Sequence, residues 1–309
     1  MLIGFENIKS KLQDSYQQNR LHHAIMLCGK NGIGKASFAK EFALEILQAG
    51  KNTHHPDLLL IEREEDKKEI SVAKIREIAK FFNQTSAISK NKFIIINSAD
   101  ELNRSSANAL LKILEEPNNN NFLILISHSI SKSLPTICSR CQIIKINDLN
   151  FDNFSKIIKE KIPDISLQQI KILSEICDNS VAKAINYGQD LSWIYEALLS
   201  SLNEKIIDEN LIKKLSDKKF DFNNFIEIVD FFFLRFIKYL YGKIDFFIFE
   251  EKEVFQNLQN KFNVDKIFQI KDEATSGLMK ATSLNLDKKL AVIIIFNLLQ
   301  CPIDFQDFI

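Results

Sequence analysis

The chain has 309 residues, which allows two or three domains and excludes a small disulfide-stapled scaffold. Forty Lys and Arg residues balance forty Asp and Glu residues, so there is no global positive field and any DNA contact must be local or shared with partners. The longest apolar runs fall far short of the roughly 20 residues of a membrane helix, and no signal peptide opens the chain, which predicts a cytoplasmic protein with no membrane contact.

The first half of the sequence alternates short apolar runs with stretches of helical periodicity. Five apolar runs predict strands at residues 24–27, 58–61, 93–96, 122–126 and 143–146. Helices are predicted at residues 37–47, 72–82 and 105–116, the last of them halted by Pro117. Because each strand is apolar almost throughout, we expect helices on both faces of a parallel sheet. Residues 1–147 therefore read as a doubly wound α/β domain.

After residue 147 the strand pattern disappears and apolar residues recur at three- and four-residue intervals to the end of the chain. A weak break around residues 187–191, containing Gly188, separates a small helical domain at 148–190 from a longer bundle at 191–309. Most of the 25 phenylalanines lie in this bundle. At helical spacing, phenylalanines indicate a core or a subunit contact more often than a cofactor site.

A phosphate-binding loop follows the first predicted strand. Residues 29–37 read GKNGIGKAS, which matches the pattern GxxxxGK between a strand and a helix. Gly29, Gly32 and Gly34 allow backbone N–H groups to turn toward a phosphate, and Lys35 would reach the terminal phosphates. The sequence therefore predicts a nucleotide-binding loop.

The groups that hydrolysis needs are missing from their usual places. Ala36 stands where a Ser or Thr hydroxyl would bind Mg²⁺, and Asn97 and Ser98 follow the third strand where an Asp and a Glu would hold metal and orient water. Asp100 and Glu101 are the only substitutes nearby, and they lie up to about 10 Å further along the chain. We therefore expect weak ATP binding, poor hydrolysis and no required cofactor.

Residues 134–142 read LPTICSRCQ and allow two interpretations. Cys138 and Cys141 form a CxxC pair, but tetrahedral zinc needs four ligands and the other cysteines stand alone, so we expect no metal. Arg140 lies between them. It is either an ordinary surface charge or a guanidinium that completes the phosphoryl-transfer site of a neighbouring subunit.

At this point the sequence resembles the delta-prime subunits of bacterial DNA polymerase III clamp loaders, a family within the AAA+ ATPases. Four stretches carry the resemblance, and it is densest before residue 147. They are residues 20–35 (RLHHAIMLCGKNGIGK), 55–57 (HPD), 105–117 (SSANALLKILEEP) and 134–142 (LPTICSRCQ). A weaker likeness links residues 285–299 to the last helix of the family's collar domain.

The resemblance implies a nucleotide-binding domain, a small helical lid and a collar that joins a five-subunit ring. It implies that Ser139, Arg140 and Cys141 form the triplet whose arginine enters the ATP site of the adjacent subunit. It also implies a stator that does not itself hydrolyse ATP or polymerise DNA. Its partners would be the gamma or tau motor subunits and the delta subunit and, through the assembly, the sliding clamp and primed DNA.

Two departures from the family pattern limit what is carried over. Residues 48–60 contain none of the cysteines with which some members bind zinc, so no zinc site is expected. Ala182 stands where active relatives place a lid arginine, which weakens the expected nucleotide binding further. Arg104, at the start of a helix, is a candidate DNA contact or a solvated charge. The alternative to a stator is an active AAA+ ATPase that uses Asp100 or Glu101.

Overall fold

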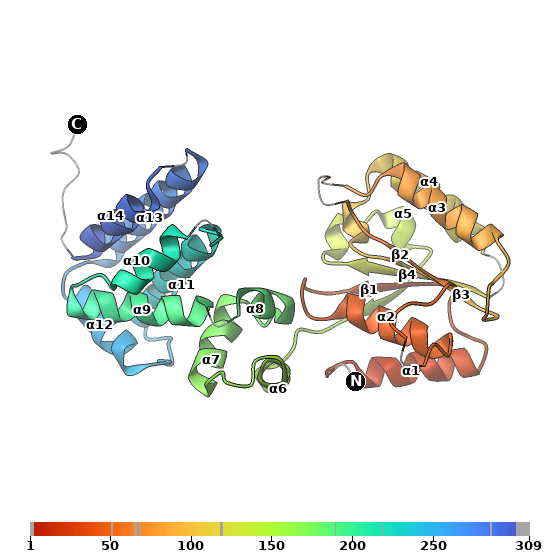
Figure 1. Ribbon diagram of the computed structural model, residues 1–309, viewed down its shortest axis with the longest axis horizontal. Coiled ribbons are helices and arrows are strands. Elements are labelled where there is room, and N and C mark those ends of the chain that lie inside the picture. The colour runs from red at the N-terminus through yellow and green to blue at the C-terminus, as the bar shows by residue number, and fades with distance from the viewer. Residues whose placement is uncertain are drawn as a thin grey trace. The chain divides into compact units, whose positions relative to one another are not determined.

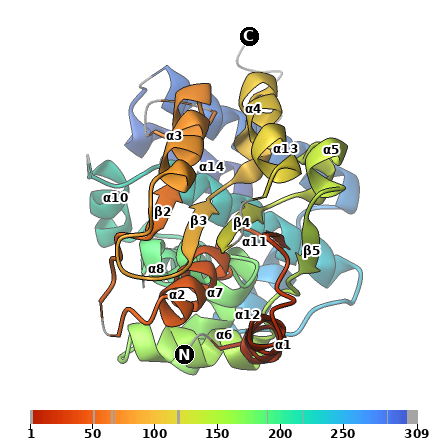
Figure 2. The same ribbon diagram turned by 90° about the vertical axis from the view of Figure 1, so that its right-hand side faces the viewer.

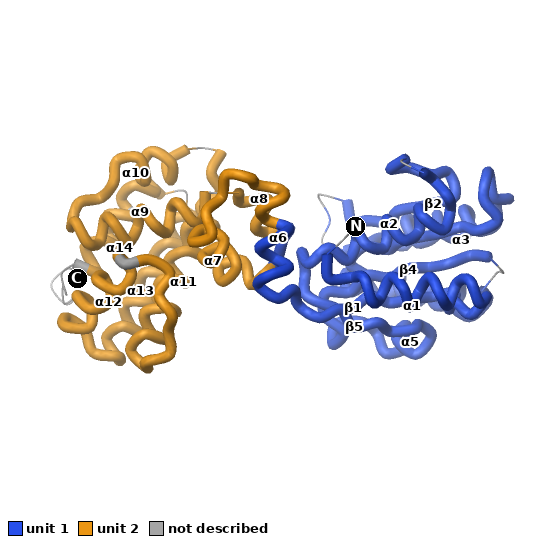
Figure 3. Tube along the Cα trace, turned by 90° about the horizontal axis from the view of Figure 1, so that it is seen from below, with its two compact units in different colours: residues 1–157, 180–182 blue, residues 158–179, 183–309 orange. Residues whose placement is uncertain are grey.

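The structure is a computed structural model that describes residues 3–50, 52–64, 67, 69–117, 120–188, 190–217, 219–284 and 286–300. It divides into two compact units (Figure 3). The α/β unit comprises Met1–Ile157 with Ser180–Ala182, and the helical unit comprises Ile158–Asn179 with Lys183–Ile309. The predicted domain boundaries at residues 147 and 190 stay predictions.

A five-stranded parallel sheet forms the centre of the α/β unit. Its strands in chain order are β1 (Ala24–Cys28), β2 (Leu58–Ile61), β3 (Lys92–Ile96), β4 (Asn121–Ser127) and β5 (Gln142–Lys145). Their order across the sheet is β2-β3-β4-β1-β5, and every neighbouring pair is parallel. This confirms the predicted α/β class, with a parallel sheet in the first part of the chain.

Helices cover both faces of this sheet (Figures 1 and 2). One face carries α1 (Glu6–Gln17) and α2 (Lys35–Ile46), and the other carries α3 (Val72–Asn83), α4 (Arg104–Glu115) and the short α5 (Pro135–Cys138). Helices α1 and α5 were not predicted, because α1 has mostly polar residues and α5 is a single turn. The sheet residues of β1, β3 and most of β4 are buried on both faces.

The expectation that every strand is covered on both faces is wrong for β2 and β5. Leu60 in β2 is 44% exposed and Ile143 in β5 is 37% exposed. Both strands lie at the edges of the sheet, so helices cover them incompletely. An apolar composition alone does not reveal which strands are central.

The helical unit consists of helices only, in the residues that the structure describes. Helix α6 (Phe151–Lys161) joins the units, and the following helices are α7 (Leu167–Ile176), α8 (Val181–Tyr187), α9 (Asp190–Glu204), α10 (Glu209–Ser216), α11 (Asn223–Leu240), α12 (Phe249–Gln259), α13 (Val264–Ser283) and α14 (Lys288–Gln300). At the predicted break Gly188, with φ +56°, lies between α8 and α9, and both helices belong to the helical unit beyond residue 182. No described helix is both long and apolar enough to cross a bilayer.

Phenylalanine rings and one buried ion pair form the core of the helical unit. Phe232, Phe236 and Phe255 are fully buried and pack with ring centroids 5.2 and 5.6 Å apart. Beside them Arg235 is 1% exposed and Glu251 is 0% exposed, and Nη2 of Arg235 lies 2.8 Å from Oε2 of Glu251. The predicted aromatic core is thus combined with a buried charge pair that the sequence pattern did not indicate.

Candidate functional site

The predicted phosphate loop connects β1 to α2, and its glycines have conformations or contacts that exclude a side chain. Gly32 has φ +79°, and a Cβ atom there would lie 1.9 Å from Oγ of Ser180. The carbonyl of Gly32 also accepts a hydrogen bond of 3.0 Å from the Ala182 N–H. A Cβ atom at Gly29 would lie 2.7 Å from the carbonyl oxygen of Ile146. The loop is therefore packed against Ile146, directly after β5, on one side and against residues 180–182 on the other.

Lys35 is the first residue of α2, and its side chain turns back onto its own loop. Only 3% of the residue is exposed. Nζ donates to the carbonyl oxygen of Gly29 at 2.7 Å and to that of Lys30. Burial lowers the pKa of Lys35 to about 8, because the charge of Asp100 offsets only part of the loss of hydration. The ammonium group predicted to meet phosphate is thus held by two neutral carbonyls.

His128 is a site residue that the sequence analysis missed. Its Nδ1 lies 3.2 Å from Nζ of Lys35, and its Nε2 lies 3.0 Å from Oγ of Ser98. Burial, and secondly the ammonium of Lys35, lower the pKa of His128, which favours the neutral ring. The available signal was its position directly after β4, since ligands of open α/β sheets bind outside the carboxyl ends of the strands.

A cavity of about 460 Å³ opens beside the loop at the carboxyl ends of the strands. Its lining includes Lys35, Ala36, Asn97, Ser98 and His128. The structure thus brings together the phosphate-loop lysine and the three positions predicted to lack catalytic groups. A methyl group, an amide, a hydroxyl and a neutral imidazole offer no carboxylate to a metal ion.

The acidic residues near this cavity are already engaged. Oδ1 of Asp100 accepts a 3.0 Å hydrogen bond from the backbone N–H of His128. Oε2 of Glu101 lies 2.9 Å from Nε of Arg63, and Glu62 accepts from the Asn97 amide at 3.1 Å. Glu62, Arg63 and Glu101 all line the cavity.

Arg140 lies on the turn between α5 and β5, and it is not among the residues that line the cavity. Its Nη2 lies 2.7 Å from Oε1 of Glu115, and its Nη1 donates to the carbonyl of Thr136 at 3.0 Å. Ser139 donates to the same carbonyl at 3.1 Å and lies 3.3 Å from Arg140 Nη1. The arginine side chain is 37% exposed, so it is held at the surface by weak, solvent-accessible contacts.

The two cysteines that flank Arg140 are packing groups. Cys138 and Cys141 are partly buried against the core between the sheet and helices α3 and α4. Burial raises the pKa of Cys141 to about 12, so its thiol stays protonated at neutral pH. Among the described residues no group of three or more His, Cys, Asp or Glu side chains is arranged to hold a metal ion. The predicted lack of zinc stays a prediction.

Arg104 is the first residue of α4 and is exposed. The helix begins there because the side chain of Asn103 accepts a 2.8 Å hydrogen bond from the backbone N–H of Ser106. The N-terminal turn of a helix attracts anions, and Arg104 adds a full charge to it. A DNA contact at Arg104 stays a prediction.

Part of this chain is similar to proteins of known families. A family model described as "DNA polymerase III, delta subunit" matches residues 4–150. DNA polymerase III subunit delta' of Pseudomonas aeruginosa is 38% identical over 135 residues, covering 38% of this chain and 41% of the relative. The subunit delta' of Bacillus subtilis is 31% identical over 196 residues, covering 58% of this chain and 57% of the relative. The chain therefore matches about half the length of these relatives.

A further relative and two solved structures extend the comparison. DNA polymerase III subunit gamma of Buchnera aphidicola is 30% identical over 202 residues, covering 60% of this chain and 56% of the relative. A gamma subunit-related protein of Thermotoga maritima aligns with a TM-score of 0.47 at 21% identity, covering 96% of this chain and 98% of that protein. The RuvB branch migration motor of the same organism aligns with a TM-score of 0.46 at 16% identity, covering 77% of each chain.

Proposed function

Given that residues 4–150 match the delta-subunit family of DNA polymerase III, and that these residues resemble delta-prime sequences, we propose that the chain is a stator subunit of a bacterial clamp loader. In this role it helps a cytoplasmic assembly place the sliding clamp on primed DNA. It binds ATP weakly or not at all and needs no zinc. Its chemical contribution is Arg140, which enters the ATP site of an adjacent gamma- or tau-type motor subunit, while a delta subunit completes the ring.

The observation that carries this proposal is the composition of the phosphate-loop cavity. Three places that need a metal ligand or a base hold Ala36, Asn97 and Ser98, and all three line one cavity with Lys35. The two acids that might replace them, Asp100 and Glu101, are held by a backbone N–H and by Arg63. The carboxylate of Glu62 also lines the cavity, where it accepts from the Asn97 amide, so no carboxylate stands at the three expected positions where Mg²⁺ would be bound.

The contacts of Arg140 are compatible with transfer to a neighbour. Its ion pair with Glu115 is half-exposed, and pairs of this kind contribute about 0–1 kcal/mol. The guanidinium can therefore exchange Glu115 for the phosphate oxygens of another subunit at small cost. An arginine supplied in trans raises phosphoryl-transfer rates by about 10³- to 10⁵-fold in comparable systems, since it stabilises charge in the transition state.

Reconstitution with the motor subunits tests the proposal. We expect Arg140→Ala to lower the DNA-stimulated ATPase rate of the assembly by at least about 10²-fold with assembly itself intact. Arg76→Ala, which removes an exposed arginine on α3, is the matched control and should leave the rate unchanged. Clamp loading at the wild-type rate with Arg140→Ala would refute the assigned role.

The alternative function is an active ATPase, and one observation supports testing it. Glu101 lines the same cavity as Lys35 and could become available if its ion pair with Arg63 opened. The purified chain would then hydrolyse ATP by itself and lose that activity on Glu101→Gln. We expect no turnover above a Lys35→Ala control in the isolated chain.

A further inference from the structure

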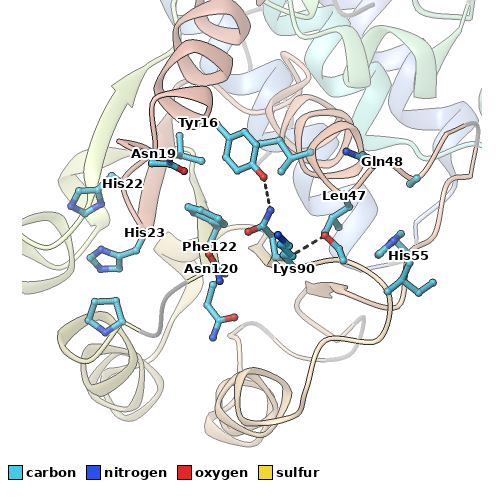
Figure 4. Close-up of a pocket in the computed structure, with 18 of the residues that line it drawn as sticks. Tyr16, Asn19, His22, His23, Leu47, Gln48, His55, Lys90, Asn120 and Phe122 are labelled. Carbon is cyan, nitrogen blue, oxygen red and sulfur yellow. Dashed lines mark hydrogen bonds between the residues drawn. The ribbon is translucent and has the colours of Figure 1, made fainter.

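A second, larger cavity lies at the amino ends of the strands, whereas the phosphate loop lies at their carboxyl ends. Its volume is about 1410 Å³, and its lining includes residues that directly precede β1 and β3 and that open β4. Figure 4 shows side chains from the ends of α1 and α2 and from these strand starts turned toward one another. Small-molecule pockets usually measure about 300–1,000 Å³, so this space suits a longer ligand.

The charged groups in this cavity are of one sign. Arg20 and Lys90 line it, both are exposed, and neither has an ion-pair partner in the described part of the chain. Of the twenty described residues that line the cavity, none is Asp or Glu. The buried carboxylate of Asp57, below the cavity, is already saturated by the backbone N–H groups of residues 87–89 at 2.7–2.9 Å. The two cations therefore stand unopposed.

The carboxyl ends of α1, α2 and α4 lie at this end of the sheet. Free carbonyl groups there would repel an anion, but hydrogen bonds cap several of them. The Ser15 and Tyr16 carbonyls at the end of α1 accept from the N–H groups of Arg20 and Asn19. At the end of α2 the Leu44 and Glu45 carbonyls accept from residues 49 and 48, and at the end of α4 the Leu114 carbonyl accepts from His23 Nε2 at 3.2 Å. The negative ends of these helix dipoles are thus partly neutralised.

The same caps present hydrogen-bonding side chains to the cavity. Asn19 and Gln48 have φ +53° and +55°, the left-handed conformation of the residue that ends a helix, and both line the cavity together with Asn52 and Asn120. Carboxamide groups donate and accept at once, so they can bind the varied edges of nucleic-acid bases. Amide side chains and two cations that line the same cavity suit a chain of phosphates that carries bases.

We propose that this cavity binds a short stretch of single-stranded nucleic acid, with Arg20 and Lys90 on its phosphates and the amide side chains on its bases. The inference rests in part on the proposed function, because a clamp loader works where primed DNA exposes a single strand. Because the net charge of the chain is zero, the protein as a whole does not attract phosphates. The attraction must come from the cations that line this cavity.

The test is fluorescence anisotropy of the full chain with a labelled dT oligonucleotide of about 12 nucleotides, between about 50 and 200 mM salt. We expect the Arg20→Ala, Lys90→Ala double variant to weaken binding about tenfold and to reduce the slope of log K against log salt by about 1.4, or 0.7 for each phosphate contact. Arg76→Ala with Lys80→Ala on α3 removes the same charge from exposed positions outside the cavity and should change neither quantity. Circular dichroism checks that both double variants fold.

Competition separates the possible ligands. Displacement of the oligonucleotide by unlabelled dT, but not by a poly-glutamate peptide of equal charge, supports the proposal. An equal effect of the peptide, binding of inorganic tripolyphosphate without binding of the oligonucleotide, or equal loss in the two double variants would overturn it. The assay contains no motor subunit and no ATP, so its failure alongside a normal Arg140 effect would leave the proposed function intact.

Discussion

Each unit of this protein buries a cation, and the two cations have opposite surroundings. In the helical unit the guanidinium of Arg235 meets both carboxylate oxygens of Glu251, donates to the Asp245 carbonyl at 2.7 Å and lies 3.6 Å from the centre of the Phe247 ring. In the α/β unit Lys35 meets two carbonyls and a neutral imidazole, and no carboxylate.

The difference distinguishes a buried charge that stabilises the fold, Arg235, from one that is available to bind an anionic ligand, Lys35. Burial lowers the pKa of Arg235, but the hydrogen bonds that it donates to Glu251 and the charge of Glu251 outweigh this and raise the pKa above its usual value. At Lys35 burial outweighs the opposing charge of Asp100, and the pKa falls to about 8. A satisfied buried charge fixes structure, whereas an uncompensated one keeps the capacity to gain from an anion.

We expect the largest effect from a substitution that removes the buried ion pair between Arg235 and Glu251. Arg235→Ala leaves the buried Glu251 without a counter-charge, with only the Tyr195 hydroxyl and the Phe247 N–H as hydrogen-bond donors, so we expect a loss of about 3–5 kcal/mol in the free energy of unfolding of the helical unit. Urea denaturation measures this loss. A double variant, Arg235→Met with Glu251→Leu, should recover most of it, because no lone charge then remains. A single variant as stable as wild type would contradict the comparison.

A pH titration of stability sharpens the comparison at Lys35. The unfolded chain keeps the lysine proton up to about pH 10.5, while the folded chain loses it near pH 8, so stability should rise with pH between these values. The rise is at most about 3 kcal/mol, and Lys35→Met should abolish it. Lys40→Met, in the same helix but half-exposed, should keep the pH dependence of the wild type. A flat wild-type profile would mean that the lysine is not destabilised by burial.

Asp57 is a buried charge of the α/β unit that we expect to behave like Arg235. Burial would raise its pKa, but the backbone N–H groups of Ser89, Ala87 and Ile88 outweigh this and hold it below its usual value. Asp57→Asn should cost about 1–3 kcal/mol at neutral pH, measured by thermal or urea unfolding. The pKa of Asp57 is lower in the folded chain than in the unfolded chain, so its carboxylate stabilises the fold at pH values above about 3.8. The difference in stability between the wild type and Asp57→Asn should therefore shrink as the pH falls below this value. Exposed Asp152→Asn is the control.

The smallest expected effect concerns the surface ion pair of Arg140. Glu115→Ala should change the free energy of unfolding by less than about 1 kcal/mol, because both side chains are partly in water. The same variant should leave stimulation of the motor ATPase at or above the wild-type level, since it frees the guanidinium. A strong loss of stimulation would show that Glu115 positions Arg140 in the assembly.

Sequence periodicity predicted the parallel sheet well, because strands buried on both faces must be apolar over four or five consecutive residues. It predicted helix α2 two residues late and missed α1, whose mostly polar sequence buries only Leu12. The phosphate loop and its missing catalytic groups were visible because their spacing is local. His128 and the ion pair of Arg63 with Glu101 were not, because those contacts join segments about 30 to 93 residues apart.

By itself the sequence determined the order of elements, the loop with Lys35 and the lack of a hydroxyl or a carboxylate at three expected positions. Each of these depends on residue type and spacing within one segment, and short-range geometry fixes what such a segment can do. Only the tertiary structure decided that β2 and β5 are edge strands, that no carboxylate contacts the ammonium of Lys35, and that Arg20 and Lys90 line one cavity at the amino ends of the strands. Those properties depend on which distant segments come together, and burial changes the energy of a charge only once its neighbours are in place.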